Sequence, residues 1–296
     1  MKNLRLIPLC LLLVPLVSQA EPLAPAAPIQ WQGWSDTLFD QAKKDNKFVL
    51  LDLEAVWCHW CHVMDETTYK DADVRNLMGS RYIAVRVDQD SRPDLSNRYE
   101  DYGWPATVVF GPDGKEIVKR AGYIPPDEMK DMLDAIIKDP TPGPSITQEK
   151  PLEVPQSPFL SDALRKDLTK SYFDNYDNDQ GSWGTVQKFL DWDGVEYAMT
   201  LARSGDAVAE KMARQTLKAQ RALIDPVWGG VYQYSTDGDW NHPHFEKIMQ
   251  MQAENLKVYA LAYAQWKDPE DLRSAQSIAG FLKNFLQSPD GAFYTS

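Results

Sequence analysis

Two cysteines separated by two residues, Cys58 and Cys61, are the part of the sequence best suited to chemistry. They follow an apolar run, residues 48–53, that is typical of a buried strand. We expect a helix after them, because the first turn of a helix leaves backbone N–H groups unpaired and carries a partial positive charge. A thiolate at that point is stabilised. The pattern therefore predicts that Cys58 is the nucleophile and that Cys61 resolves the mixed disulfide.

Three other uses of the motif are open. With His62 it matches C-x-x-C-H, the attachment signature of c-type haem, although haem attachment does not require a buried strand directly before it. Zinc is a second alternative, with both thiolates and one or two histidines as ligands, but the sequence has no second C-x-x-C or H-x3-H set. A structural disulfide would close so short a loop that it would constrain the unfolded chain very little. We favour redox exchange, with no metal and no cofactor beyond a redox-active Cys58–Cys61 disulfide.

Residues 1–20 have the pattern of a signal peptide. Lys2 and Arg5 form a basic start, residues 6–17 are apolar, and the segment ends in a small-x-small cleavage pattern. The apolar stretch is too short and too interrupted by proline for a membrane span, and cleavage would remove Cys10. We therefore expect an exported protein, periplasmic in a Gram-negative bacterium and otherwise secreted, with no stable membrane anchor after cleavage and one cysteine pair.

The chain is acidic, with a net charge of −12, and 43% of its residues are hydrophobic. The negative charge disfavours nucleic acid and anionic lipid as the main partner. Protein thiols or disulfides, or another redox partner, are the partners that the cysteine motif predicts. The hydrophobic content is enough for a sizeable core, and the length of 296 residues suggests two domains.

The order of patterns predicts an α/β domain over residues 31–139 and an all-α domain over residues 159–296. A proline- and alanine-rich tether, residues 21–30, and a proline-rich linker, residues 140–158, flank the first of these domains. In the first domain strand patterns alternate with helix patterns before a hairpin and a closing helix. The strands are expected at 48–53, 82–88, 103–110 and 116–120, and the helices at 34–46 (capped by Ser35), 73–78 and 126–137. In the second domain helices are expected at 160–173, 194–203, 207–224, 245–266 and 269–286.

Residues 31–139 resemble the thioredoxin fold. Trp57, Cys58 and Cys61 match its active-site motif, and Asp52 matches the buried carboxylate that relays a proton to the second cysteine. Pro105 matches the proline that faces the disulfide, which is cis in that family. The resemblance implies that Pro105 and Trp104 shape a substrate groove.

The chain departs from thioredoxin in the two residues between the cysteines, His59 and Trp60, where thioredoxin has Gly-Pro. A protonated His59 would stabilise the thiolate and make the pair more oxidising. The direction of electron flow therefore stays open.

A second motif, residues 239–247, contains two of the four histidines in the chain. His244 and Glu246 are expected near the start of a helix, beside Trp240 and Tyr234, where they would form a polar site in an aromatic pocket. Capping and packing are the commoner roles for such residues, and we weight them above catalysis.

Taken together, the motifs resemble the spermatogenesis-associated protein 20 family from about Trp31 to the end of the chain. The residues that carry the resemblance are 57–64, 87–88, 92–94, 103–105 and 243–247. That family joins a thioredoxin-like domain to an (α/α) toroid similar to N-acylglucosamine epimerases and six-hairpin glycosidases. The resemblance therefore implies an alternative function, in which the helical half binds or processes a sugar and the thioredoxin-like half is a scaffold.

The chain also departs from that family. Lys188 and Phe189 keep part of a family element, but Leu190 stands where a proline is expected. The five helices expected are too few for a toroid of about twelve, so we expect a truncated or partial toroid. Its open edge would expose an apolar side made of Phe281, Leu282, Phe285 and Leu286, which would dimerise or destabilise the helical part.

Overall fold

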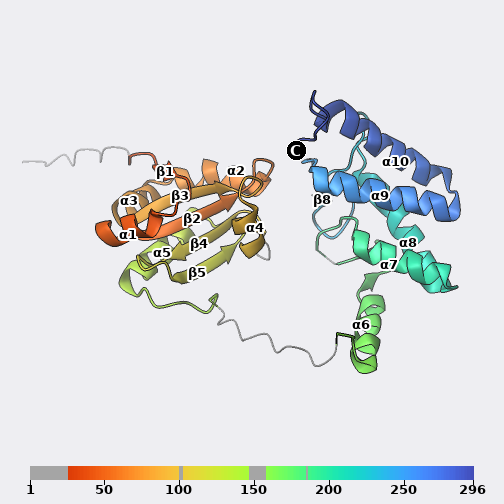
Figure 1. Ribbon diagram of the computed structural model, residues 1–296, viewed down its shortest axis with the longest axis horizontal. Helices are drawn as coiled ribbons and strands as arrows, with labels where there is room; N and C mark the ends of the chain where they lie inside the picture. Colours follow the sequence, from red (N-terminus) through yellow and green to blue (C-terminus); the bar gives the residue numbers. More distant parts are fainter. Residues whose placement is uncertain (1–25, 100–102, 147–157, 185) are drawn as a thin grey trace, which may run out of the picture.

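The computed structural model describes residues 26–99, 103–146, 158–184 and 186–296. The expected signal peptide, Cys10 and residues 147–157 of the expected linker lie outside these ranges. Figure 1 shows an α/β N-terminal half and a largely helical C-terminal half, which confirms the predicted fold class. The domain boundaries themselves stay a prediction.

The N-terminal half is built on a five-stranded mixed sheet in the order β1-β3-β2-β4-β5. Strands β1 and β2 pair parallel with β3, whereas β4 pairs antiparallel with both β2 and β5. The strands are β1 (Trp31–Gln32), β2 (Phe48–Glu54), β3 (Tyr82–Asp88), β4 (Ala106–Phe110) and β5 (Glu116–Ala121). Because β2 is the central strand, its residues from Phe48 to Leu53 are all buried, as the continuous apolar run predicts.

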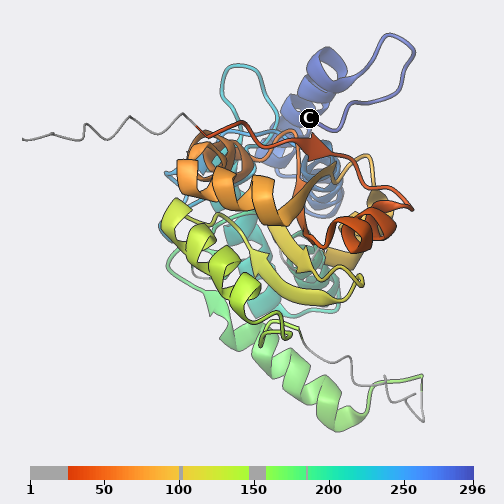
Figure 2. The same cartoon turned by 90° about the vertical axis from the view of Figure 1, so that its left-hand side faces the viewer.

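Helices cover both faces of the sheet. Side chains of α2 (His59–Glu66), α3 (Ala72–Arg81) and α5 (Pro126–Lys138) form one core with Phe48 and Leu50 of β2. Side chains of α1 (Leu38–Asp45) and α4 (Pro93–Tyr99) form the other core with Val49 and Leu51. Figure 2 shows α3 and α5 side by side in front of the sheet. This is the thioredoxin-like arrangement implied by the sequence.

Two details of the N-terminal half differ from the expectation. The first helix begins at Leu38 instead of Trp34, and Ser35 does not cap it with its side chain. Its backbone carbonyl accepts the N–H of Leu38 at 3.2 Å, so a backbone turn starts the helix. Strand β1 was not expected, because two residues are too few to show an alternating pattern.

The C-terminal half is all-α apart from two short strand pairs. Its helices are α6 (Asp162–Asp174), α7 (Trp192–Arg203), α8 (Ala207–Gln220), α9 (Met249–Trp266) and α10 (Pro269–Phe281), with single turns η3 (Arg221–Leu223) and η4 (Leu282–Leu286). A short turn η1 (Thr68–Lys70) lies in the other half. The strand pairs are β6 (Tyr176–Asp177) with β7 (Ser182–Trp183), and β8 (Tyr234–Ser235) with β9 (Pro243–His244). No helix among the described residues is long and apolar enough to cross a membrane.

The helix expected from Phe245 begins only at Met249. The residues before it are extended, because Pro243 and His244 pair with β8 as β9. The Nζ atom of Lys247 lies 2.6 Å from Asp225 Oδ2, and this ion pair fixes the segment that directly precedes α9 in the chain. The second motif therefore lies on a bend, residues 239–242, and on the short strand and irregular segment that follow it, and not on a helix.

The apolar edge expected at the C-terminal helix is largely covered. Phe281, Leu282 and Leu286 are buried in the core of the helical half, and only Phe285 is half exposed. The chain after η4 folds back on it, since the N–H of Tyr294 donates to the carbonyl of Leu286 at 2.9 Å. The expectation of an open apolar edge at these residues is wrong for three of the four.

A buried ion pair holds the segment that follows β7. The side chain of Lys188 is fully buried, and its Nζ contacts Asp177 Oδ2 at 2.8 Å and the carbonyl of Gly184 at 2.8 Å. Removing one partner of such a pair leaves a charge in the interior without compensation. Lys188 thereby fixes the position of the neighbouring Phe189.

We expect Asp177→Asn to lower the free energy of unfolding by roughly 2–3 kcal/mol, because the Lys188 ammonium keeps its buried place but loses its counterion. Urea unfolding monitored by circular dichroism measures the change. Asp174→Asn is the matched control, because Asp174 pairs with Lys170 on the exposed surface of α6. Equal midpoints for the two variants would show that the buried pair has no special weight.

Candidate active site

The two cysteines lie at the start of α2 and are joined by a disulfide with an S–S distance of 2.04 Å. Cys58 is the N-cap residue of the helix, and its Sγ accepts a hydrogen bond from the N–H of Cys61 at 3.1 Å. Their exposed fractions are only 4% and 3%. The sulfur of Cys58 therefore meets the unpaired N–H groups of a helix start, as expected from the spacing.

An aromatic frame surrounds the disulfide. Trp57 and Trp104 pack against the two cysteines, and the indole N–H of Trp57 donates to Asp90 Oδ2 at 3.2 Å. The Trp104–Pro105 peptide bond is cis, the isomer that the thioredoxin resemblance implied. The carbonyl of Pro105 accepts the N–H of Gly122 at 2.8 Å, which ties this loop to the end of β5.

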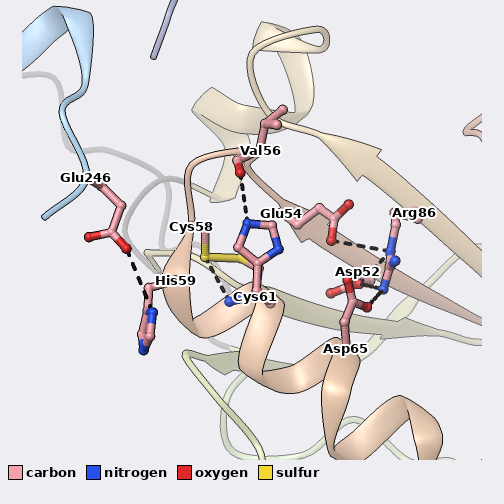
Figure 3. The surroundings of a disulfide bond; sticks show 10 residues. Asp52, Glu54, Val56, Cys58, His59, Cys61, Asp65, Arg86 and Glu246 are labelled. Carbon is pink, nitrogen blue, oxygen red and sulfur yellow. Dashed lines mark hydrogen bonds and ion pairs between the residues drawn. A yellow bond between two sulfur atoms is a disulfide. The ribbon is translucent and has the colours of Figure 1, made fainter. Parts of the chain in front are cut away.

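A buried charge cluster lies on the other side of α2 from Glu246, as Figure 3 shows. Arg86 Nη2 contacts Asp52 Oδ2 at 2.8 Å and Asp65 Oδ1 at 2.5 Å, and Arg86 Nε lies 3.4 Å from Glu54 Oε2. The guanidinium also stacks 4.1 Å above the ring of Trp31. Although the three carboxylates are close enough to share a cation, Arg86 supplies the positive charge at their centre.

Burial sets the acidity of this cluster. It raises the pKa of Asp52 to about 6, against the opposing attraction of Arg86. The pKa of Glu54 is raised to about 7, by burial first and by the charge of Asp52 second. Asp52 therefore exchanges its proton close to neutral pH. Its carboxylate accepts hydrogen bonds from Arg86 Nε at 3.0 Å and from Arg86 Nη2 at 2.8 Å.

The second motif lies against the first. Glu246 Oε1 is 3.8 Å from His59 Nδ1 (Figure 3), and the rings of His59 and His244 meet edge to face at 5.3 Å. The ring of Trp60 lies 6.4 Å from that of His244. His244 itself stacks on Tyr234 at 4.4 Å, and burial lowers its pKa. The residues expected to form a separate site thus border the cysteine pair.

Trp240 does not join them. It is 6% exposed, belongs to the core of the helical half, and donates its indole N–H to the carbonyl of Gln180 at 2.8 Å. The expected trio of His244, Glu246 and Trp240 is therefore not assembled. The sequence placed these residues together only because they are close along the chain.

The disulfide opens onto a cavity of about 620 Å³ between the two halves. Its N-terminal wall includes Cys58, His59 and the loop at Gly103. The helical half contributes Tyr234, which the sequence placed beside the second motif. It also contributes residues that the sequence did not single out as a site: Gln187, Phe189, Trp192, Gln233, Ile248, Gln250 and Met251. Of these, only Phe189 carried a signal, as part of the Lys188–Phe189 family element.

His62 is used structurally. Its Nε2 lies 2.9 Å from the carbonyl of Val56, and because a carbonyl only accepts, Nε2 carries the proton. The ring therefore anchors the loop before the cysteines, while the two sulfurs are bonded to each other.

Comparison with known proteins agrees with the thioredoxin-like fold of the N-terminal half. A family model described as "Thioredox_DsbH: Protein of unknown function, DUF255" matches residues 22–138. Spermatogenesis-associated protein 20 of Rattus norvegicus is 26% identical over 304 residues, covering 91% of this chain and 38% of that protein. The chain thus spans well under half the length of this relative.

Two further matches concern the N-terminal half. A thioredoxin of Mycoplasmoides gallisepticum is 35% identical over 94 residues, covering 32% of this chain and 89% of that protein. The solved structure of a DsbH oxidoreductase has 20% sequence identity and a TM-score of 0.35, covering 42% of this chain and 93% of that one.

The raised pKa of Asp52 makes a prediction about stability. The unfolded carboxyl ionises near 3.8 but the folded one only near 6, so the folded state loses stability as the pH rises through this window. The loss attributable to Asp52 is roughly 2 kcal/mol between pH 4 and pH 7. We expect Asp52→Asn to flatten the dependence of the unfolding free energy on pH, measured by urea unfolding at several pH values. Asp131→Asn, on the exposed side of α5, is the control, and an equally steep curve in Asp52→Asn would contradict the assignment.

Proposed function

We propose that this chain, which belongs to the spermatogenesis-associated protein 20 family, is a thiol–disulfide oxidoreductase that works through Cys58 and Cys61. The observation that carries the proposal is the Cys58–Cys61 disulfide at the N-cap of α2, on a thioredoxin-like domain and open to a cavity. A thioredoxin-like domain favours a protein thiol or another redox partner as the reactant. The activity of the full-length relatives is not carried over, because the chain covers 38% of their length.

The reaction follows from the two sulfurs. A partner thiolate attacks Cys58 Sγ, the Cys58–Cys61 bond breaks, and Cys61 leaves as a thiolate that takes up a proton. A second partner thiol then attacks the mixed disulfide and releases the Cys58 thiolate and the oxidised partner. Two electrons pass from the partner thiols to the cysteine pair, and the reverse sequence oxidises the pair's own thiols.

In this scheme Asp52 is a proton reservoir for Cys61. Its pKa of about 6 allows it to be protonated or ionised with small changes of pH. Arg86 keeps the ionised form tolerable in the interior, and Trp104 with Pro105 borders the path of the partner.

Export belongs to the same proposal. It is supported by the signal-peptide pattern of residues 1–20 and by a mature chain with one cysteine pair. An oxidising compartment, periplasmic or extracellular, would keep that pair available for disulfide exchange.

Single substitutions of the two cysteines test the proposal. We expect Cys58→Ser to abolish reduction of a disulfide substrate, because the attacking thiolate is lost. Cys61→Ser should still attack but fail to resolve, so that a mixed disulfide on Cys58 accumulates. Mass spectrometry after thiol labelling separates these outcomes, and the unsubstituted mature chain is the control. Undiminished exchange by Cys58→Ser would refute the assignment.

A second candidate is carbohydrate binding, favoured by the aromatic rings and glutamine amides that line the cavity. Sugars present both hydroxyl groups and apolar faces, which these side chains complement. If a sugar binds there, neutral mono- and disaccharides raise the melting temperature of the full chain, and Trp192→Ala removes the rise. Identical melting curves with and without every sugar would leave the redox function alone.

A further inference from the structure

The cavity at Cys58 is bordered by residues of both halves of the protein. Both cysteines are almost fully buried, and residues of the helical half stand opposite the Trp104 loop. A volume of about 620 Å³ lies within the range of small-molecule sites, and the cavity is open to solvent where Gln187, Phe189 and Gln250 are exposed. A stable protein–protein interface instead buries a broad surface, about 800 Å² on each partner. The geometry favours a small reactant.

The side chains that line the cavity are almost all uncharged, and this disfavours an anionic reactant. Among the described residues that line the cavity, none is lysine, arginine, aspartate or glutamate. Two acidic side chains stand just behind the lining, Glu246 beside His59 and Asp90 at the indole of Trp57. Apart from His59, whose Nδ1 lies 3.8 Å from the carboxylate of Glu246, no described side chain of the lining can carry a positive charge, so a carboxylate on the ligand would lose its hydration with little compensation.

The polar groups that are present are amides. Within the described part of the chain, the side-chain amides of Gln187, Gln233 and Gln250 make no hydrogen bond to the protein. Each offers two N–H donors and a carbonyl acceptor to a ligand. All three come from the helical half, while the reactive sulfur comes from the other. Hydroxyl and amide groups are the ligand chemistry that such side chains complement.

We infer that the redox partner of Cys58 in this cavity is a low-molecular-mass disulfide, or its thiol, that carries hydroxyl or amide groups and no net negative charge. The inference rests on the proposed oxidoreductase function and names its substrate class. The helical half supplies recognition through Gln187 and Gln250, and the thioredoxin-like half supplies the sulfur chemistry.

The reduced cysteine pair and the small disulfide react by thiol–disulfide exchange in two steps. In the reduced protein the Cys58 thiolate attacks one sulfur of the small disulfide, whose S–S bond breaks, and the leaving thiolate is protonated by solvent. Cys61 loses its proton, attacks Cys58 Sγ and releases the second small thiol. Two electrons pass from the cysteine pair to the small disulfide, which is the oxidant. The small thiol is the reductant in the reverse direction.

Single-turnover kinetics of the full chain, reduced beforehand and freed of reductant, test the inference. The substrates are 2-hydroxyethyl disulfide, which is neutral, cystine diamide, which carries amide groups and is cationic, oxidised glutathione, which is anionic, and insulin as a protein disulfide. We expect the first two to react at least about tenfold faster than the other two, because desolvation of an uncompensated anion or exclusion of a chain opposes reaction. Faster reaction of glutathione disulfide or insulin would overturn the inference while leaving the oxidoreductase function intact. Failure of all four would refute the function itself.

A double variant, Gln187→Ala with Gln250→Ala, tests recognition. We expect its half-saturating concentration of 2-hydroxyethyl disulfide to rise about fivefold, because two hydrogen bonds are lost, with the limiting rate unchanged. Gln276→Ala, an exposed glutamine on α10 away from the cavity, is the matched control. Circular dichroism and the redox potential of the pair confirm that the double variant is folded. The same half-saturating concentration in both variants would show that the amides do not bind the substrate.

Discussion

The structure depends on the placement of Cys58 at the first turn of α2. A thiolate is an anion, and the N–H groups at a helix start are the donors that an anion needs. The N–H of Cys61 already points at Cys58 Sγ at 3.1 Å in the disulfide form. The central strand β2 makes this placement rigid, since six consecutive buried residues lead the chain to the point where the helix begins. The chemistry is thus set by the most heavily packed strand of the sheet.

The same packing creates the charge cluster behind the disulfide. Asp52 lies on β2 among apolar neighbours, so its charge is costly unless it is compensated. Arg86, opposite it in the parallel pair of β2 and β3, provides the compensation and also draws in Asp65 from α2. The ring of Trp31 covers the guanidinium from β1. The result is that the pKa of Asp52 is raised to about 6. The burial that raises this pKa also makes the folded state less stable as the pH rises, because the ionised carboxylate is costly in the interior.

The sequence predicted the cysteine motif, the strand before it and the helix after it, because periodicity and the C-x-x-C spacing are local signals. It also predicted the fold class of both halves. It did not predict that His244 and Glu246 border His59, since that contact joins residues far apart in the chain. The start of α9 was wrong because Pro243 and the pairing with β8 keep His244 extended. The prediction that Trp240 lies beside His244 in a pocket was wrong, because Trp240 is buried in the core of the helical half. Closeness in the sequence does not show whether a side chain lines a cavity or packs in a core. The glutamines of the cavity carry no sequence signal at all.

The cavity is lined by both halves of the protein, and in the proposed function each half meets a different requirement: the N-terminal half the sulfur chemistry, the helical half the selectivity. The proposed thiol exchange needs a fixed geometry of two sulfurs, a helix start and a carboxyl group that can hold a proton. All of these lie within the thioredoxin-like domain. Selectivity needs side chains that face the attacking sulfur from across a gap, and no residue on α2 itself can do this. The segment from β8 to α9 meets that need, because Tyr234, His244 and Glu246 reach the His59–Trp60 dipeptide that replaces the Gly-Pro of thioredoxin. The two residues between the cysteines therefore form a contact between the helical half and the cysteine motif, and this is the contact through which the proposed selectivity would act.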